Sequence, residues 1–183
     1  MERLHSAHAI KKLVTCALFT AIIAVMAQLA IPMPIGVPVT LQTFAMALCG
    51  YILGWKYGSV SVFAYLLLGA VGVPVFANFK GGIGALFGMT GGYLTGFLFM
   101  VILCGLGATR KNKLCSILLG LAGLAACHIL GVIQFAAVSG GSIWRSFMVA
   151  SLPYLIKDVV SVVGAYLISL TVCRRLREAN LIE

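Results

Sequence analysis

One carboxylate lies inside an apolar segment of this sequence, and the chemistry that the chain can perform depends on it. Between Glu2 and Glu178 the only acidic residue is Asp158, in the run SLPYLIKDVVSVVGAYLISL. A charge at membrane depth is costly, so it normally faces the interior of a helix bundle and meets a partner or a substrate. A single interior acid provides no pair for general acid–base catalysis, and no Ser/His/Asp or Cys/His triad can be assembled. Asp158 therefore predicts a binding site or an ion path, and not an enzyme.

Lys157 directly precedes this carboxylate. Neighbours in sequence point about 100° apart on a helix, so we expect the two side chains to pair poorly and to be available to a ligand. The alternative is that they only neutralise each other, with the lysine reaching toward the surface. With Ser151 as N-cap and Pro153 in the first turn, the helix begins near Leu152 and its N-terminus favours a bound anion.

A glycine-rich stretch forms a second candidate region. Gly81 to Leu94 reads GGIGALFGMTGGYL, with six glycines and no charge. Irregular backbone at membrane depth is tolerated only where it is buried in protein or lines a cavity, and glycine permits close approach to a ligand. We therefore expect Gly91 to lie at the site, with Asn78 as donor and acceptor and Tyr93 as an aromatic face. The alternative is that Gly91, Gly92 and Gly96 are helix-packing positions.

Two further segments contribute candidates. IPMPIGVPVTLQT, from Ile31, has three prolines before polar Thr40 and Gln42, and it predicts either a lid that offers both residues to a ligand or a rigid turn with a helix cap. Ala17 and Ala21 are spaced A-x-x-x-A in the first apolar run and predict a face for close helix contact, within the bundle or with a partner subunit.

His128 and Gln134 follow no metal-ligand spacing, and we expect His128 to be hydrogen-bonded within the bundle and no metal to be bound.

The composition requires these residues to be positioned by membrane helices. The 183-residue chain is 62% hydrophobic and 9% charged with a mean hydropathy of +1.11, which predicts an all-α integral membrane protein with residues 1–183 in one bundle. The six cysteines are scattered and predict small buried apolar residues without disulfides. Six spans are expected, at about Leu13–Ile31, Val39–Leu53, Ser59–Val73, Gly91–Ala108, Leu114–Val138 and Leu152–Cys173.

Lys and Arg are distributed unevenly between the connections. With the N-terminus inside, ten of them fall in the inner segments, two (Lys80 and Arg145) fall outside, and Lys157 lies in the last span. The positive-inside rule therefore places both termini in the cytoplasm, and the net charge of +9 indicates a membrane protein and not a nucleic-acid partner. No G-x-x-x-x-G-K-[ST] motif occurs, so any ATP is hydrolysed by another subunit.

Three motifs together carry a resemblance to a known family. PVTLQTFAMALCG, VPVF…GGIGALFGMTGGYLTGF and LPYLIKD, at these separations, resemble the BioY family, the biotin-binding S component of energy-coupling factor (ECF) vitamin transporters. The resemblance implies a bacterial cell-membrane protein that captures biotin outside and works with a transmembrane T component and two cytoplasmic ATPases. It implies that Asp158, Asn78, Tyr93 and Gln42 occupy pocket positions. Met89 stands where the family usually has proline.

Ser161 stands where many members have lysine, and Lys157, one turn nearer the outside, can supply the same ammonium. Biotin chemistry fits these residues: Asp158 accepts ureido N–H groups, Asn78 donates to the ureido carbonyl, and Lys157 or Lys80 meets the tail carboxylate. Biotin would then be a transported ligand, with no cofactor. The competing hypothesis is a proton-coupled small-molecule carrier in which Asp158 is the relay.

Overall fold

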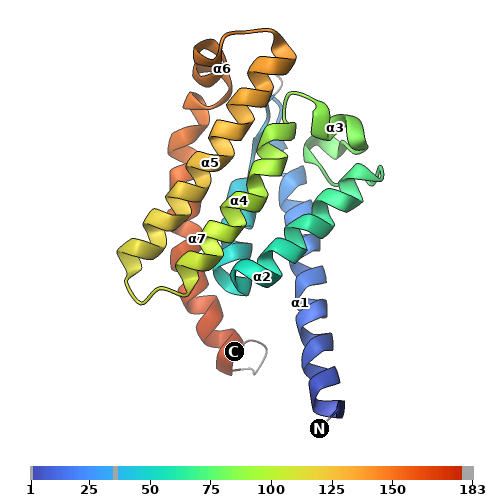
Figure 1. Ribbon diagram of the computed structural model, residues 1–183, viewed down its shortest axis with the longest axis vertical. Helices are drawn as coiled ribbons and strands as arrows, with labels where there is room; N and C mark the ends of the chain where they lie inside the picture. Colours follow the sequence, from blue (N-terminus) through green and yellow to red (C-terminus); the bar gives the residue numbers. More distant parts are fainter. Residues whose placement is uncertain (1, 35–36, 179–183) are drawn as a thin grey trace.

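The computed structural model describes residues 2–34 and 37–178 and shows a helical bundle (Figure 1). Five of its helices are long and apolar enough to cross a membrane. They are α1 (Glu2–Gln28), α2 (Gln42–Ala70), α4 (Gly91–Ala108), α5 (Lys113–Ser139) and α7 (Leu152–Glu178). The prediction of a helical membrane protein is confirmed at this level.

The second and third expected spans are two helical arms that meet at a kink, and α2 includes both of them. Instead of a connection beginning at Gly54, α2 leaves helical geometry only at Gly54, with φ 73° and ψ 176°, and resumes at once. This backbone conformation is available essentially only to glycine. Gly105 of α4 lies against the bend, because a Cβ there would be 2.2 Å from the Trp55 nitrogen. The described chain therefore has five long helices when α2 is counted once, and the two arms of α2 correspond to the second and third of the six expected spans.

Short elements gather at the end of the molecule opposite the bend in α2 (Figure 1). Strands β1 (Ala30–Ile31) and β2 (Val39–Thr40) pair antiparallel within the first expected connection, whose residues 35 and 36 lie outside the described part. The glycine-rich connection holds the 3₁₀ turn η1 (Ala77–Phe79) and α3 (Ile83–Phe87). The segment after Ser139, expected to be a loop, contains α6 (Ile143–Ala150), and α7 begins at Leu152 as predicted.

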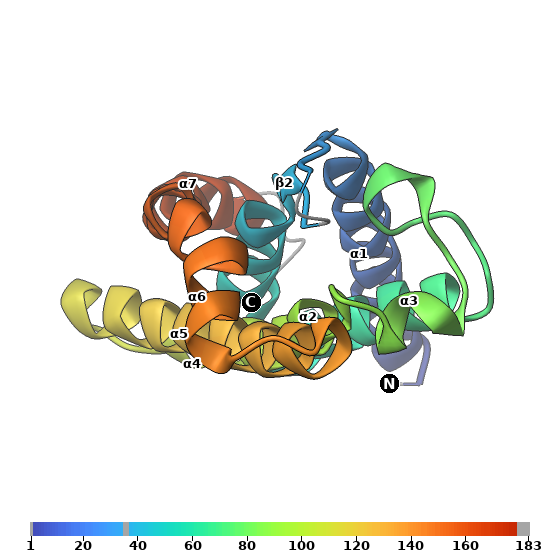
Figure 2. The ribbon, with the colours of Figure 1, turned by 90° about the horizontal axis from the view of Figure 1, so that it is seen from above.

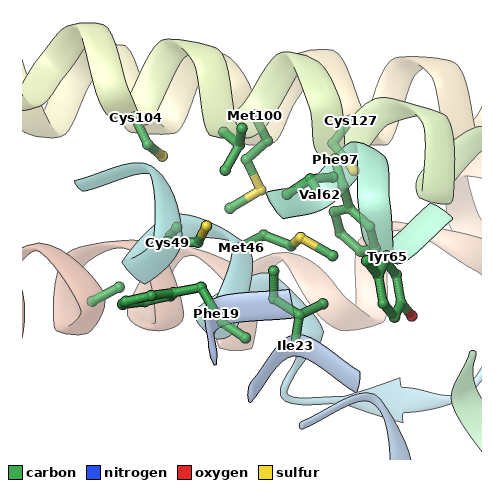
Figure 3. Close-up of a cluster of buried hydrophobic side chains, with 14 of the residues drawn as sticks. Phe19, Ile23, Met46, Cys49, Val62, Tyr65, Phe97, Met100, Cys104 and Cys127 are labelled. Carbon is green, nitrogen blue, oxygen red and sulfur yellow. The ribbon is translucent and has the colours of Figure 1, made fainter. Parts of the chain in front are cut away.

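The core forms where α4 packs against α2 and α5. Figure 3 shows side chains of different helices meeting there, among them Ile23 of α1, Met46 of α2, Met100 of α4 and Cys127 of α5. No disulfide joins the cysteines, all of which lie in the described residues; four of the six are buried, as the sequence predicted, whereas Cys115 and Cys173 are partly exposed.

The glycines of α4 allow its close contact with α5. A Cβ on Gly92 would be 2.2 Å from the Leu130 carbonyl oxygen, and one on Gly96 would be 2.7 Å from the Cα of Cys127. The helix-packing interpretation of these two glycines is therefore correct.

The start of α1 and the end of α7 lie at one end of the bundle, with the bend of α2 and the α4–α5 turn (Figure 1). Seen from the opposite end, α4 and α5 run along one side, and α7, β2 and α1 lie on the other (Figure 2). This arrangement agrees with an even number of membrane crossings, and the side of the membrane on which the termini lie stays a prediction.

Candidate functional site

A cavity is lined by residues of α2, α4, α5 and α7, together with β2 and the loop around η1. It encloses about 80 Å³ that water could occupy. Its polar lining comes from several different elements and includes Thr40, Gln42, Thr43, Lys80, Thr90, Tyr93, His128, Tyr154, Lys157 and Asp158. Its apolar lining includes Phe76, Phe97, Leu124 and Ala150.

Asp158 is the buried acid of this cavity, with 5% of its surface exposed. Helix α7 turns Tyr154, Asp158 and Val162 inward at i, i+4 spacing, while Ile156, at 81% exposure, faces outward. The Asp158 carboxylate meets Lys157 Nζ at one oxygen and His128 Nε2, 3.2 Å away, at the other. The carboxylate therefore sits between two basic groups.

The expectation that Lys157 and Asp158 pair poorly is wrong. The four-carbon stem of lysine lets Nζ turn back to the adjacent carboxylate although the two Cβ atoms diverge. The same ammonium donates to the Thr40 carbonyl oxygen at 2.9 Å and so links α7 to β2. Lys157 keeps 30% of its side chain exposed, which places it at the rim of the cavity, above a more deeply buried Asp158.

A chain of hydrogen bonds extends behind the carboxylate. His128 Nδ1 lies 2.9 Å from Ser151 Oγ, which lies 2.8 Å from Tyr93 Oη, and Tyr93 donates to the Ala150 carbonyl oxygen at 2.6 Å. The Ser151 hydroxyl, expected to cap α7, takes part in this chain instead. The Tyr93 and His128 rings also meet edge to face at 5.8 Å. Residues of α4, of α7 and of the junction between α6 and α7 thus fix the position of His128, which was predicted to be hydrogen-bonded but was not assigned to the site.

Gln42 and Thr40 form the opposite wall. Gln42 Nε2 donates to the Tyr65 hydroxyl at 2.7 Å, and its Oε1 accepts from the Thr40 hydroxyl at 3.2 Å. Both side chains are buried and line the cavity, as expected for residues available to a ligand. Tyr154 secures the neighbouring segment by donating to the Val37 carbonyl oxygen at 2.6 Å.

Two of the predicted site residues lie outside the cavity lining. Asn78 is exposed on η1, with φ 59°, next to Ala77, which does line the cavity. Gly91 is a packing position at the start of α4, because a Cβ there would be 1.8 Å from the Leu86 carbonyl oxygen and 2.4 Å from Gln134 Nε2. Roles of Asn78 and Gly91 in ligand binding stay predictions. Lys80, the other candidate cation, does line the cavity.

Two glutamines hold the loop that covers the cavity. Gln28, at the end of α1, donates from Nε2 to the carbonyl oxygens of Val75 (3.0 Å) and Phe76 (3.2 Å) and accepts from the Phe79 amide (2.9 Å). Gln134 of α5 donates to the carbonyl oxygens of Leu86 and Gly88 at 2.8 and 2.9 Å. The irregular backbone near the site is thus satisfied by side chains from two different helices.

Ala17 and Ala21, the predicted partner-binding residues, are both exposed on α1, together with Leu13 and Leu18. They therefore make no tight contact within this chain. Contact with a partner subunit stays a prediction.

Within the described residues there is no group of three His, Cys, Asp or Glu that could hold a metal ion. No buried side-chain nitrogen or oxygen in that part of the chain lacks a hydrogen-bond partner. Asp158, Lys157 and Gln42 already make hydrogen bonds within the protein. A ligand that enters the cavity and binds to them must therefore replace some of these bonds.

Comparison with known proteins finds relatives that are similar over most of the chain. The biotin transporter BioY of Thermotoga maritima is 42% identical over 161 residues, covering 87% of this chain and 94% of that protein. The probable biotin transporter BioY of Pyrococcus horikoshii is 37% identical over 160 residues, with 87% and 94% covered. The names of these relatives are those of transporters and not of enzymes.

Among solved structures, the crystal structure of the S-component for biotin from an ECF-type ABC transporter is similar, with a TM-score of 0.80 and 30% identity. The similarity covers 93% of this chain and 92% of that one. The model of the BioY family matches residues 1–178. The chain therefore belongs to the BioY family.

Proposed function

We propose that the chain captures biotin from the outer side of a bacterial cell membrane and delivers it inward as the S component of an ECF transporter. The observation that carries the proposal is the buried Asp158 carboxylate, held between Lys157 and His128 in a cavity with apolar walls. The names of the relatives and of the similar solved structure support the same ligand.

The pairing of Lys157 with Asp158 suits a urea. A ureido ring presents a carbonyl acceptor beside an N–H donor, and the two charged groups present an ammonium donor beside a carboxylate acceptor. We expect Asp158 to accept from the ureido nitrogen and Lys157 to donate to the ureido oxygen. Both bonds involve charged groups and are therefore of the stronger kind.

The rest of biotin is apolar apart from its tail carboxylate. Phe76, Phe97 and Leu124 provide apolar wall for the fused rings and the aliphatic tail, with Tyr93 as an additional face. Lys157 is engaged with Asp158 and Thr40, so we assign the tail carboxylate to Lys80 at the rim.

Ligand entry requires the cavity to widen. Small-molecule pockets typically measure roughly 300–1,000 Å³. The space of about 80 Å³ is therefore that of a contracted site. We propose that the loop around η1, which carries Ala77 and Lys80, moves outward to admit biotin and is drawn back by the bonds of Gln28.

The energy for transport has to come from other subunits. The sequence has no phosphate-binding loop, and the exposed Ala17 and Ala21 face of α1 is suited to close contact with a membrane helix. We propose that this face meets the T component, which joins the chain to two cytoplasmic ATPases, and that the two arms of α2 both cross the membrane. Six crossings then place both termini in the cytoplasm.

Uptake of labelled biotin by cells without their own biotin transporter tests the proposal. We expect accumulation only when the T component and ATPases are co-expressed, with little effect of a protonophore applied at constant cellular ATP. Accumulation by the chain alone, abolished by the protonophore, would contradict the proposal and favour a proton-coupled carrier.

A further inference from the structure

A second cleft, of about 830 Å³, shares no lining residue with the cavity of Asp158. Its lining includes residues near the start of α1 and the end of α7, which lie at one end of the molecule (Figure 1). Four elements form its walls: α1, the bend of α2, the turn between α4 and α5, and the second half of α7. The turn joins the last residue of one candidate span, Ala108, to the first residue of the next, Lys113. The cleft is therefore at the depth where lipid headgroups meet the protein.

Basic side chains dominate this cleft. Five basic residues and one acidic residue line it, which gives a net charge of +4, and the basic ones are Lys12, Arg110, Lys111, Lys113 and Arg174. The acid, Glu178, is bound by Arg174 at 3.2 Å and by Arg175 at 3.3 Å. Among the described residues, no carboxylate forms an ion pair with Arg110, Lys111 or Lys113. Three cations of the α4–α5 turn thus face the cleft without a neutralising acid.

Apolar surface continues from these cations along the helices. Ile52 and Leu53 of α2 and Leu170 of α7 line the same cleft, and Leu170 is 45% exposed. A ligand with a charged head and an apolar body fits this lining better than a small hydrated anion, because the cleft presents apolar side chains as well as basic ones.

We infer that this cleft binds an anionic phospholipid, with its phosphate at Arg110, Lys111 and Lys113 and its acyl chains along Leu53 and Leu170. Phosphate accepts charge-assisted hydrogen bonds from guanidinium and ammonium groups, and basic pockets between membrane helices are suited to anionic headgroups. The inference does not depend on biotin binding, because the two sites lie at opposite ends of the bundle.

Native mass spectrometry of the chain released from detergent and titrated with phosphatidylglycerol or phosphatidylcholine tests this inference. We expect phosphatidylglycerol to bind at least about fivefold more tightly, which is roughly the effect of one well-placed cation. The triple substitution Arg110→Gln, Lys111→Gln, Lys113→Gln should reduce this preference below about twofold. Lys56→Gln is the matched control, because Lys56 lies beside the bend of α2 but does not line the cleft.

Equal affinity of the wild-type chain for the two lipids would overturn the inference, and so would a preference that survives the triple substitution. Displacement of phosphatidylglycerol by millimolar inorganic phosphate would assign the site to free phosphate and overturn the lipid assignment. If the triple variant fails to fold, Lys113→Arg is measured in its place. This substitution keeps the charge and should retain the preference for phosphatidylglycerol. Biotin binding by the triple variant, measured in parallel, separates failure of this inference from failure of the proposed function.

Discussion

Gln28 allows the role of the covering loop to be tested without touching a residue of the cavity. Gln28→Leu keeps a similar volume and removes the donor to the Val75 and Phe76 carbonyl oxygens and the acceptor of the Phe79 amide. An amide NH₂ has two hydrogens, so two donated bonds and one accepted bond are the most that can be lost. Each of these hydrogen bonds contributes about 0.5–1.5 kcal/mol. Because water replaces part of them at this exposed edge, the substitution should destabilise the closed loop by about 1–3 kcal/mol.

If the loop is mostly open in the free chain and biotin binds only beneath the closed loop, the same free energy is lost from binding. Calorimetry should then show the Kd for biotin raised about 5- to 150-fold. Hydrogen exchange should show faster exchange of the Phe76 and Gly82 amides, which donate to Lys80 and Gly69 when the loop is closed. Val25→Ala is the control, because Val25 lies on the same helix and is 63% exposed. Unchanged affinity together with unchanged exchange of the loop would refute the reasoning.

Two further substitutions test the site and the packing. His128→Gln removes the imidazole that bridges Ser151 and the Asp158 carboxylate. Because hydrogen bonds to charged groups contribute about 1.5–3 kcal/mol, the Kd for biotin should rise about tenfold or more. Calorimetry checks this, and an unaltered Kd in a well-folded variant would remove His128 from the site. Gly92→Ala places a Cβ 2.2 Å from the Leu130 carbonyl oxygen and should cost about 1–3 kcal/mol of stability. Gly164→Ala, whose Cβ meets nothing within 4 Å, should be nearly neutral in the same thermal unfolding assay in detergent, and equal losses would argue against tight α4–α5 packing.

The sequence predicted the parts of the fold that hydropathy and local signals determine. The bounds of α4 agree with the expected span, and α7 begins at the expected residue. The break between the second and third expected spans does lie at Gly54, but the connection was expected to extend over several residues, whereas a single positive-φ residue is enough to redirect the helix. Helix α6 was missed because its eight residues are too few to stand out against a polar connection.

The site could be predicted from the sequence only where a residue can be recognised by its own type and its position in the chain. Asp158 is identified by its charge in an apolar helix, and Gln42 and Thr40 by their polarity at a helix start. His128 was not assigned, because its partners Asp158 and Ser151 are more than 20 residues away and only packing of α5 against α7 brings them together. The pairing of Lys157 with Asp158 was misjudged from helical angles, since the length of a lysine side chain overrides the divergence of adjacent Cβ atoms.

Equilibrium binding of biotin to the purified chain in detergent, measured by calorimetry beside Asp158→Asn, tests the central claim most directly. The substitution keeps the size of the side chain and removes the charge between Lys157 and His128. The wild-type chain should bind biotin one to one without ATP or other subunits, and Asp158→Asn should weaken binding about tenfold or more, since bonds to charged groups are the strong ones. A folded, monodisperse wild-type chain that binds no biotin, or an Asp158→Asn variant that binds it equally well, would contradict the account.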